Sequence, residues 1–384
     1  MEKIKVVHSR PIWLRTPENW LHTQVIYLDE SIEPYVICES VQNLDQFQVN
    51  NIHQLPRPSF FESGYERLLR RLGLHTYSRA FLRALRNINP AILHSHFGHA
   101  GWQEMPAAKK AGVRQIVTFY GYDVNKVPSD NPAWKERYKK LFQHIDLVLC
   151  EGPFMAQSIM NLGCPAHKVR VHHLGIPVHE IPFKPRIWEK NQPLRVLLAA
   201  SFREKKGIPY ALDALGKIQE RVPLDITIIG DADESAGSQA EKQKILQSIQ
   251  NHNLGTITHL LGYQPHEVLL QEAYTHHIFL SPSVTASDGD TEGGAPITLL
   301  EMAATGMPLV STRHCDIPEV IQDGETGFLA EERDVQGLVH HLRWLIENRN
   351  SWTPFLEKSR KHVEREYNAE IQGRKLANIY KEVL

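Results

Sequence analysis

The chain alternates short apolar runs with longer segments of helical spacing, and this alternation limits its fold more than any other feature. The helical segments include residues 209–222, 234–251 and 265–276. Apolar strands separated by helices are typical of parallel sheets that are covered on both faces. We therefore predict an α/β protein with two series of six strands, at Ile4–Val7, Tyr35–Cys38, Ala91–His94, Gln115–Phe119, Leu147–Cys150 and Val169–His172, then Arg195–Ala199, Asp225–Ile229, Thr256–Leu261, Ile278–Leu280, Pro308–Ser311 and Gly327–Leu329.

A proline-rich stretch near residues 175–193 interrupts this pattern and predicts a boundary between two domains. We expect a Rossmann-like domain over residues 1–180, a linker over 181–193 and a second Rossmann-like domain over 194–355. A charged helix over 356–384 is expected to pack across the domains. Ligands of open parallel sheets bind beyond the carboxyl ends of the strands. Two such domains facing each other would form an interdomain cleft there.

The composition narrows the range of partners. A net charge of -1 over 384 residues gives no reason to expect nucleic acid. The four cysteines lie far apart, which argues against a zinc ribbon or a disulfide framework. No apolar run approaches the length of about 18 residues that spans a membrane, and no secretory signal begins the chain. We expect a soluble, cytoplasmic protein.

The segment SPSVTASDGDTEGGAPITLLEMAATGMPLVST, residues 281–312, is the most specific feature of the sequence. It follows a predicted strand, is glycine-rich through Gly294, and enters a predicted helix at Pro296. The amides of Ile297 and Thr298 would then lie unpaired at the helix N-terminus, where they and the helix dipole favour a diphosphate. The alternative is an ordinary turn before the helix.

Two carboxylates flank this predicted phosphate site. Glu292 and Glu301 are poor neighbours for a phosphate, so we expect them to bind hydroxyl groups, of a sugar for Glu292 and of a ribose for Glu301. For Glu301 the alternative is an exposed residue on a helix. The DGD motif at residues 288–290 could hold a metal ion, but cationic and amide donors already serve the site, and we expect no metal and no cofactor.

A basic turn, SFREKKGIPYALDAL at residues 201–215, follows another predicted strand. Arg203 and Lys206 would suit a diphosphate at such a turn, the arginine by paired hydrogen bonds and the lysine as a point charge. The alternative is a solvated charged turn.

The N-terminal half carries polar groups after three predicted strands. The segment ILHSHFGHAGW holds His94, His96 and His99, which are either site residues or buried, hydrogen-bonded histidines; a zinc site lacks carboxylate or thiol partners. Tyr120 lies in TFYGYDV. Thr16 and Asn19, next to two tryptophans in the loop at residues 9–25, suit a carbohydrate acceptor.

Together these segments resemble glycosyltransferase family 4, a group of retaining enzymes with the GT-B fold. The resemblance extends to residues 260–283 and to DIPEVIQDGETGFLA at 316–330. Three departures are visible: eight residues separate Glu292 from Glu301 where the family has seven, Ser201 replaces an arginine, and Tyr120 replaces a histidine that contacts the donor sugar. The resemblance implies catalytic roles for Glu292, Lys206 and Tyr120 or His96, and donor contacts by Arg203, Tyr263, Gln264, Gly294, Ala295, Pro296, Ile297, Thr298 and Glu301.

The resemblance implies transfer of a hexosyl unit from a nucleotide sugar, with UDP-glucose as an example, to a saccharide or a lipid-linked saccharide. Two alternatives stay open: an epimerase or phosphorylase of the same fold, and a catalytically idle nucleotide-sugar-binding protein. Residues 65–86 hold six arginines among leucines and aromatics. This composition suits peripheral contact with the anionic inner face of the plasma membrane, and the alternative is a solvated basic helical pair.

Overall fold

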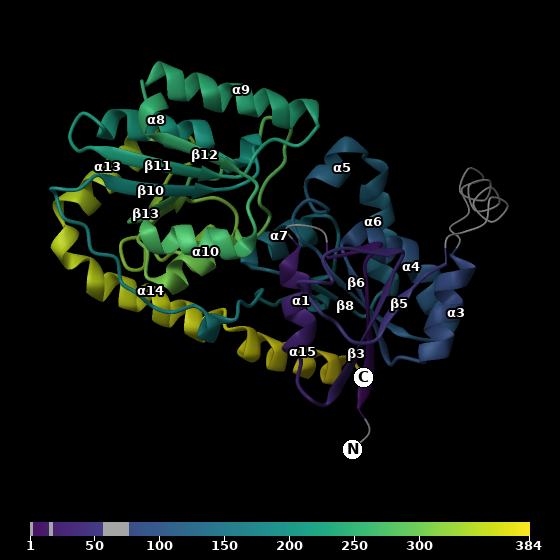
Figure 1. Cartoon of the computed structure of the whole chain (residues 1–384). Coiled ribbons are helices and arrows are strands. Elements are labelled where there is room, and N and C mark those ends of the chain that lie inside the picture. The colour runs from purple at the N-terminus through teal and green to yellow at the C-terminus, as the bar shows by residue number, and fades with distance from the viewer. Residues whose placement is uncertain (1–2, 15–17, 57–76) are drawn as a thin grey trace. The chain divides into compact units, whose positions relative to one another are not determined.

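The structure, a computed structural model, describes residues 3–14, 18–56 and 77–384. It divides into two compact units (Figure 1). Unit 1 comprises residues 1–177 and 368–384, and unit 2 comprises residues 178–367. The chain therefore leaves unit 1 once and returns to it for its last 17 residues.

Unit 1 is built on a seven-stranded sheet in the order β5-β3-β1-β6-β7-β8-β9, and every neighbouring pair is parallel. The short strands β2 and β4 form a separate parallel pair. The strands are β1 (Ile4–Ser9), β2 (Ile12–Trp13), β3 (Ile32–Cys38), β4 (Ser40–Val41), β5 (Ile52–Gln54), β6 (Ile92–His96), β7 (Arg114–Thr118), β8 (Leu147–Cys150) and β9 (Val169–Val171). The helices are α1 (Asn19–Ile26), α3 (Arg79–Ile88), α4 (Gly98–Ala111), α5 (Lys126–Asp130), α6 (Ala133–His144), α7 (Pro153–Asn161) and α15 (Ala369–Val383).

Unit 2 repeats this plan with a six-stranded parallel sheet in the order β12-β11-β10-β13-β14-β15. Figure 1 shows α8 and α9 on one face of the sheet and α10 on the other. The strands are β10 (Leu194–Ala199), β11 (Leu224–Ile229), β12 (Thr258–Gly262), β13 (Ile278–Ser281), β14 (Leu309–Thr312) and β15 (Phe328–Ala330). The helices are α8 (Ile208–Ile218), α9 (Ala236–Asn251), α10 (His266–Thr275), α11 (Ile297–Thr305), α12 (Ile317–Val320), α13 (Val335–Glu347) and α14 (Trp352–Glu366).

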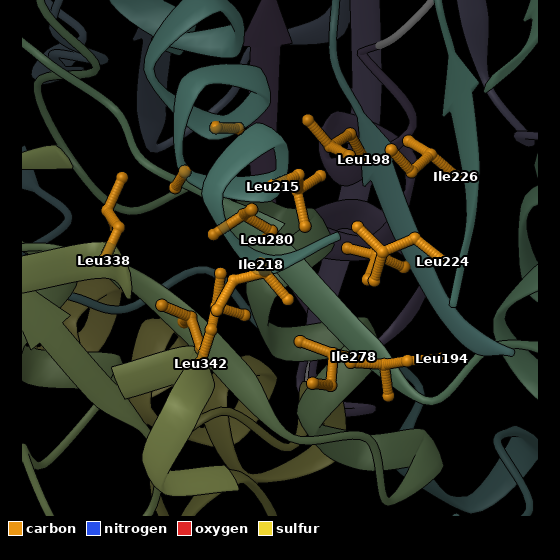
Figure 2. Close-up of a cluster of buried hydrophobic side chains, with 14 of the residues drawn as sticks. Leu194, Leu198, Leu215, Ile218, Leu224, Ile226, Ile278, Leu280, Leu338 and Leu342 are labelled. Carbon is orange, nitrogen blue, oxygen red and sulfur yellow. The ribbon is translucent and has the colours of Figure 1, made fainter. Parts of the chain in front are cut away.

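The core of unit 2 explains why its strands read as apolar runs. Alternate residues of β10, Leu194, Val196 and Leu198, lie at most 1% exposed in one hydrophobic cluster. Figure 2 shows this cluster, in which Leu215 and Ile218 of α8 meet side chains of β10, β11 and β13. Burying each such side chain stabilises the fold by roughly 1.5–3 kcal/mol relative to leaving it exposed. Polar residues at these strand positions would therefore destabilise the sheet.

Each of the twelve predicted strands corresponds to an observed strand, and the predicted α/β class with parallel sheets is confirmed. The strands β2, β4 and β5 were not predicted. They contain two, two and three residues, which is too short for a run of apolar residues to stand out.

The predicted linker and the predicted final helix differ from the structure. Residues 181–193 pack onto unit 2, where the buried Arg186 donates hydrogen bonds to the carbonyls of Ala273 at 2.6 Å and His276 at 2.9 Å. Residues 356–384 form parts of two helices, because α14 ends at Glu366 and Asn368 caps the start of α15. Its side-chain oxygen accepts from the amide of Glu370 at 2.8 Å, which begins α15.

Candidate functional site

The candidate site of unit 2 lies where the strand order of its sheet reverses. The chain runs from β10 to β11 and β12 on one side, and then returns to place β13 on the other side of β10. The loops after β10 and β13 therefore leave the same edge of the sheet in opposite directions. Such a switch point is where open α/β sheets bind ligands.

The N-terminus of α11 faces this edge with unpaired backbone donors. Pro296 is the N-cap, with φ −58° and ψ 130°, so the helix starts at Ile297, one residue later than predicted. Within the described residues, the amides of Ile297 and Thr298 form no hydrogen bond. Gly294 is buried and Ala295 is half-buried in the loop that leads into the cap. Free amides at the positive end of a helix dipole suit a phosphate.

Lys206 and Glu292 form the charged centre of the site. Nζ of Lys206 donates to Oε2 of Glu292 at 2.8 Å, and the hydroxyl of Ser283 donates to Oε1 at 2.8 Å. Burial alone would raise the pKa of Glu292, but the charges of Lys206 and Lys205, with these hydrogen bonds, lower it to about 2. The Glu292 carboxylate is therefore fully ionised, and Lys206 of the loop after β10 binds it.

Two residues that the sequence analysis missed support the loop that carries Glu292. The amide of Glu292 donates to Nε2 of His314 at 3.1 Å, and Nδ1 of His314 lies 2.6 Å from Oε1 of Glu332. Glu332 also accepts from the amide of Thr285 at 2.7 Å. His314 and Glu332 follow β14 and β15, so four neighbouring strands contribute to one site.

Glu301 is buried in α11 and meets a histidine from the neighbouring helix. Its Oε1 lies 2.7 Å from Nε2 of His266, the first residue of α10, and the Glu301 side chain is 6% exposed. This hydrogen bond raises the pKa of His266 against the effect of burial. Sequence reasoning named Glu301 but had no signal for His266. Since the carboxylate is buried, the alternative of an exposed helix residue is excluded.

The remaining predicted donor contacts gather beside the loop after β11. Arg203, half-exposed, pairs with Asp233 at 3.1 Å and does not join the Lys206–Glu292 pair. Tyr263 is 58% exposed, and partial burial followed by the charge of Asp233 raises the pKa of its hydroxyl. The side chain of Gln264 donates to the carbonyl of Leu261 at 2.6 Å. An exposed aromatic ring offers a stacking surface for a planar base.

The predicted residues of the N-terminal half lie in unit 1, and His94, His96 and Tyr120 are buried there. His96 is 0% exposed, and its Nδ1 lies 2.6 Å from the hydroxyl of Tyr120, which follows β7 and is 8% exposed. Asp123, also buried, accepts from the amides of Tyr120 at 2.9 Å and Gly98 at 2.6 Å, and burial raises its pKa to about 6. Thr16 lies outside the described residues.

His94 and His96 match the alternative of buried, hydrogen-bonded histidines, and His99 is half-buried. In the described part of the chain, His8, His94 and His96 are three residues whose donor atoms come within 4.8 Å of one another, as a metal site needs. The rings of His8 and His96 stack with centroids 5.3 Å apart, and the ring nitrogens already meet other side chains. This geometry fits a hydrogen-bonded network better than a coordination sphere.

Two family descriptions match most of the chain. Residues 18–180 match Glycosyltransferase Family 4, and residues 180–366 match Glycosyl transferases group 1. Amylovoran biosynthesis glycosyltransferase AmsK of Erwinia amylovora is 33% identical over 289 residues, covering 74% of this chain and 68% of the relative. Putative colanic acid biosynthesis glycosyltransferase WcaL of Escherichia coli is 31% identical over 293 residues, covering 74% and 69%.

Solved structures share the fold over nearly the whole length. Anabaena Alr3699/HepE in complex with UDP and glucose has a TM-score of 0.77 at 15% identity, covering 99% of this chain and 100% of that one. Sucrose-phosphate synthase from Thermosynechococcus elongatus has a TM-score of 0.76 at 16% identity, covering 99% of each chain. At these identities the likeness concerns the fold alone.

Proposed function

The chain belongs to the family 4 glycosyltransferases, which makes it a transferase of the GT-B fold, and on that premise we propose that unit 2 binds a UDP-sugar from which a hexosyl unit is transferred. The observation that carries the proposal is the meeting of unpaired α11 amides, Lys206 and two buried carboxylates at the switch point of one sheet.

The diphosphate is assigned to the N-terminus of α11 and to Lys206. The amides of Ile297 and Thr298 supply neutral donors, and an ammonium group has enough N–H donors to keep its bond to Glu292 while it binds a phosphate oxygen. The positive charge stabilises the departing UDP, which is a large part of the catalytic problem in glycosyl transfer.

The hydroxyl groups of the donor are assigned to the two carboxylates. Glu301 would bind the ribose, since a buried ionised oxygen gains most from O–H donors. Glu292 and the loop through Gly294 would orient the transferred sugar. Tyr263 and Gln264 are assigned to the base, with Arg203 beside them.

The acceptor is assigned to unit 1. Asn19 begins α1, and Trp20 of the same helix lies with its ring centroid 4.3 Å from that of Tyr120. The described residues offer no assured nucleophile at this place, so we favour transfer with retained configuration in which the leaving phosphate assists the acceptor hydroxyl. The relatives named for amylovoran and colanic acid biosynthesis support an acceptor in exopolysaccharide synthesis.

Calorimetric titration of UDP into the full chain tests the donor assignment. We expect Glu301→Gln to weaken binding at least about tenfold, a loss of about 1.4 kcal/mol, because the amide is a weaker acceptor for the ribose hydroxyls. Glu325→Gln, on an exposed turn of the same unit, is the matched control and should bind like the unaltered protein. Equal affinity in both variants would refute the assignment of Glu301.

A panel of nucleotide sugars and acceptors then separates the classes of function. Transfer of the sugar with the anomeric configuration of the donor, followed by NMR, is the expected result. An inverted product would refute the retaining mechanism. Dependence on inorganic phosphate would indicate a phosphorylase, and UDP binding with neither transfer nor hydrolysis would indicate an idle binding protein.

We also propose that α3 contacts an anionic membrane surface at the inner face of the plasma membrane, where a lipid-linked acceptor would lie. Its buried face holds Phe81 and Leu85, while Arg79, Arg83 and Arg86 are exposed. Residues 65–76 of the basic segment lie outside the described residues. Among those described, no helix has both the length and the apolar character needed to cross a membrane.

Sedimentation with anionic vesicles at low salt tests the membrane proposal. Charges on a membrane surface contribute about 1 kcal/mol per basic residue, so replacing the three α3 arginines by glutamine should release most of the bound protein. The control removes three exposed lysines of α6, Lys135, Lys139 and Lys140. Equal binding of the two triple variants would contradict a specific role of α3.

A further inference from the structure

A run of hydrogen bonds crosses the interior of unit 1 between Tyr120 and α15. The Tyr120 hydroxyl lies 2.6 Å from Nδ1 of His96, and Nε2 of His96 lies 3.0 Å from Nδ1 of His8. Nε2 of His8 lies 3.5 Å from the hydroxyl of Tyr380, on α15. The run thus joins residues from β1, β6, the loop after β7 and a helix that is remote in sequence.

The run continues from Tyr380 back to the sheet. The Tyr380 hydroxyl lies 2.6 Å from Nδ1 of His94, and Nε2 of His94 lies 2.6 Å from Oγ1 of Thr118 on β7. Thr118 ends β7 and precedes Tyr120 by two residues. The network therefore returns close to the residue where it started.

Burial forces every ring in this network to be neutral. His8, His94 and His96 are 0% exposed, and burial lowers the pKa of His8 to about 3 and holds the other two well below their ordinary value. A neutral imidazole has one N–H and one lone pair. With both nitrogens of each ring engaged, the direction of one hydrogen bond sets the direction of all the others.

The partners at the two ends of the run favour one direction. Nε2 of Gln24 donates to the Tyr120 oxygen at 3.4 Å, and Nδ1 of His96 is the other partner of this hydroxyl among the described residues. The O–H of Tyr120 then finds its acceptor in Nδ1 of His96, and the Nε2–H of His8 finds its acceptor in the Tyr380 hydroxyl at the other end of the run. It follows that His96, His8 and His94 all carry their proton on Nε2, and that Tyr380 accepts from His8 and donates to His94.

We propose that Tyr380 is a positioning residue for Tyr120, which it holds, through His8 and His96, with the phenolic O–H turned into the protein. The proposal rests on the proposed function, in which Tyr120 lies beside the sugar-binding edge of unit 1. Its ring packs against Trp20 and Phe97, with centroids 4.3 and 4.8 Å away. At that edge Tyr120 then presents a ring face and an acceptor oxygen, but no donor.

Nitrogen-15 NMR of the histidine rings in the full chain tests this directly. The unaltered protein should show the Nε2–H tautomer for His8, His94 and His96. Tyr380→Phe removes one oxygen and keeps the ring, so His8 and His96 should move toward the Nδ1–H form. Tyr138→Phe is the matched control, because Tyr138 is equally buried in unit 1 and its hydroxyl has no hydrogen-bond partner among the described residues.

Kinetics provide the second measurement. We expect Tyr380→Phe to lower the transfer rate about fivefold to tenfold, as the loss of one hydrogen bond allows, with UDP affinity unchanged because UDP binds to unit 2. Unchanged tautomers in Tyr380→Phe, or a metal ion held stoichiometrically by the three histidines, would overturn the proposal. Shifted tautomers in a chain that transfers no sugar would uphold the hydrogen-bond network and refute the transferase function instead.

Discussion

Two buried carboxyl groups show how single residues control charge in this protein. Glu292 is held by Lys206 and Ser283, and its pKa falls to about 2. Glu104, on α4, accepts from the hydroxyl of Ser9 at 2.7 Å, while its Oε2 has no partner among the described residues. Burial therefore raises the pKa of Glu104 to about 7. Ionisation is retained only where a cation faces the carboxylate.

Glu104 makes stability depend on pH in a direction that can be measured. Its pKa is near 4.5 in the unfolded chain and about 7 in the folded one, so stability falls as pH rises through this window and is constant above it. Glu104→Gln removes the ionisation. Its stability relative to the unaltered protein should increase by about 3 kcal/mol between pH 4.5 and pH 7.5, measured by urea unfolding. A difference that does not change with pH would contradict the raised pKa.

Local sequence identified the residues at strand ends but not their partners. Glu292, Glu301 and Lys206 lie in short sequence motifs whose position after predicted strands indicates a binding site. His266, His314 and Glu332 reach the same site from other strands and helices, and nothing in their local sequence shows that contact. Likewise, the sequence could not show that Tyr120 turns inward to His96, because the two residues lie 24 positions apart.

At the scale of elements, the site depends on how closely two loops approach. Gly207, between the turn at Glu204–Lys206 and α8, has φ +64° and lies against the loop after β13. A Cβ at this position would come within 1.9 Å of the carbonyl oxygen of Pro282. The absence of a side chain therefore lets Lys206 reach Glu292.

Gly207→Ala should destabilise unit 2 by at least about 2 kcal/mol, since a left-handed backbone conformation alone costs roughly 1–2 kcal/mol with a side chain. UDP binding should weaken with it. The control is Gly237→Ala in α9, where nothing lies within 4 Å of the added carbon and stability should rise by about 0.5–1 kcal/mol. Urea unfolding of both variants measures this, and a neutral effect at Gly207 would contradict the close approach.

Elements were easier to predict than their ends. The apolar runs located all twelve core strands because a strand covered on both faces has few polar positions. The short strands and the break between α14 and α15 depend on contacts with distant segments and on the cap at Asn368. Helix α11 begins one residue after the proline for a similar local reason, since Pro296 adopts an extended conformation.

At the scale of the whole molecule, the buried histidines are distributed unevenly. Among the described residues of unit 1, burial lowers the pKa of six histidines, including His8 to about 3 and His99 and His172 to about 4; the others are His22, His94 and His96. In unit 2 it lowers the pKa of His276, His277 and His341, while that of His266 is raised.

A histidine with a lowered pKa contributes stability above pH 6.5 that is lost as the pH falls toward its folded pKa, at about 1.4 kcal/mol per pH unit. Asp123 and Glu104, whose pKa values are raised, oppose this loss in unit 1, but they are fewer. We therefore expect unit 1 to unfold before unit 2 when the pH falls from 6.5 to 4. Hydrogen exchange followed by mass spectrometry measures both units, and earlier loss of protection in unit 2 would contradict this.

A crystal structure of the full chain with UDP tests the central claim most directly. The diphosphate should lie about 3 Å from the amides of Ile297 and Thr298, with Lys206 on a phosphate oxygen and the ribose hydroxyls on Glu301. UDP bound elsewhere, or a side chain of Glu301 that stays with His266 and makes no contact with the nucleotide, would contradict the account.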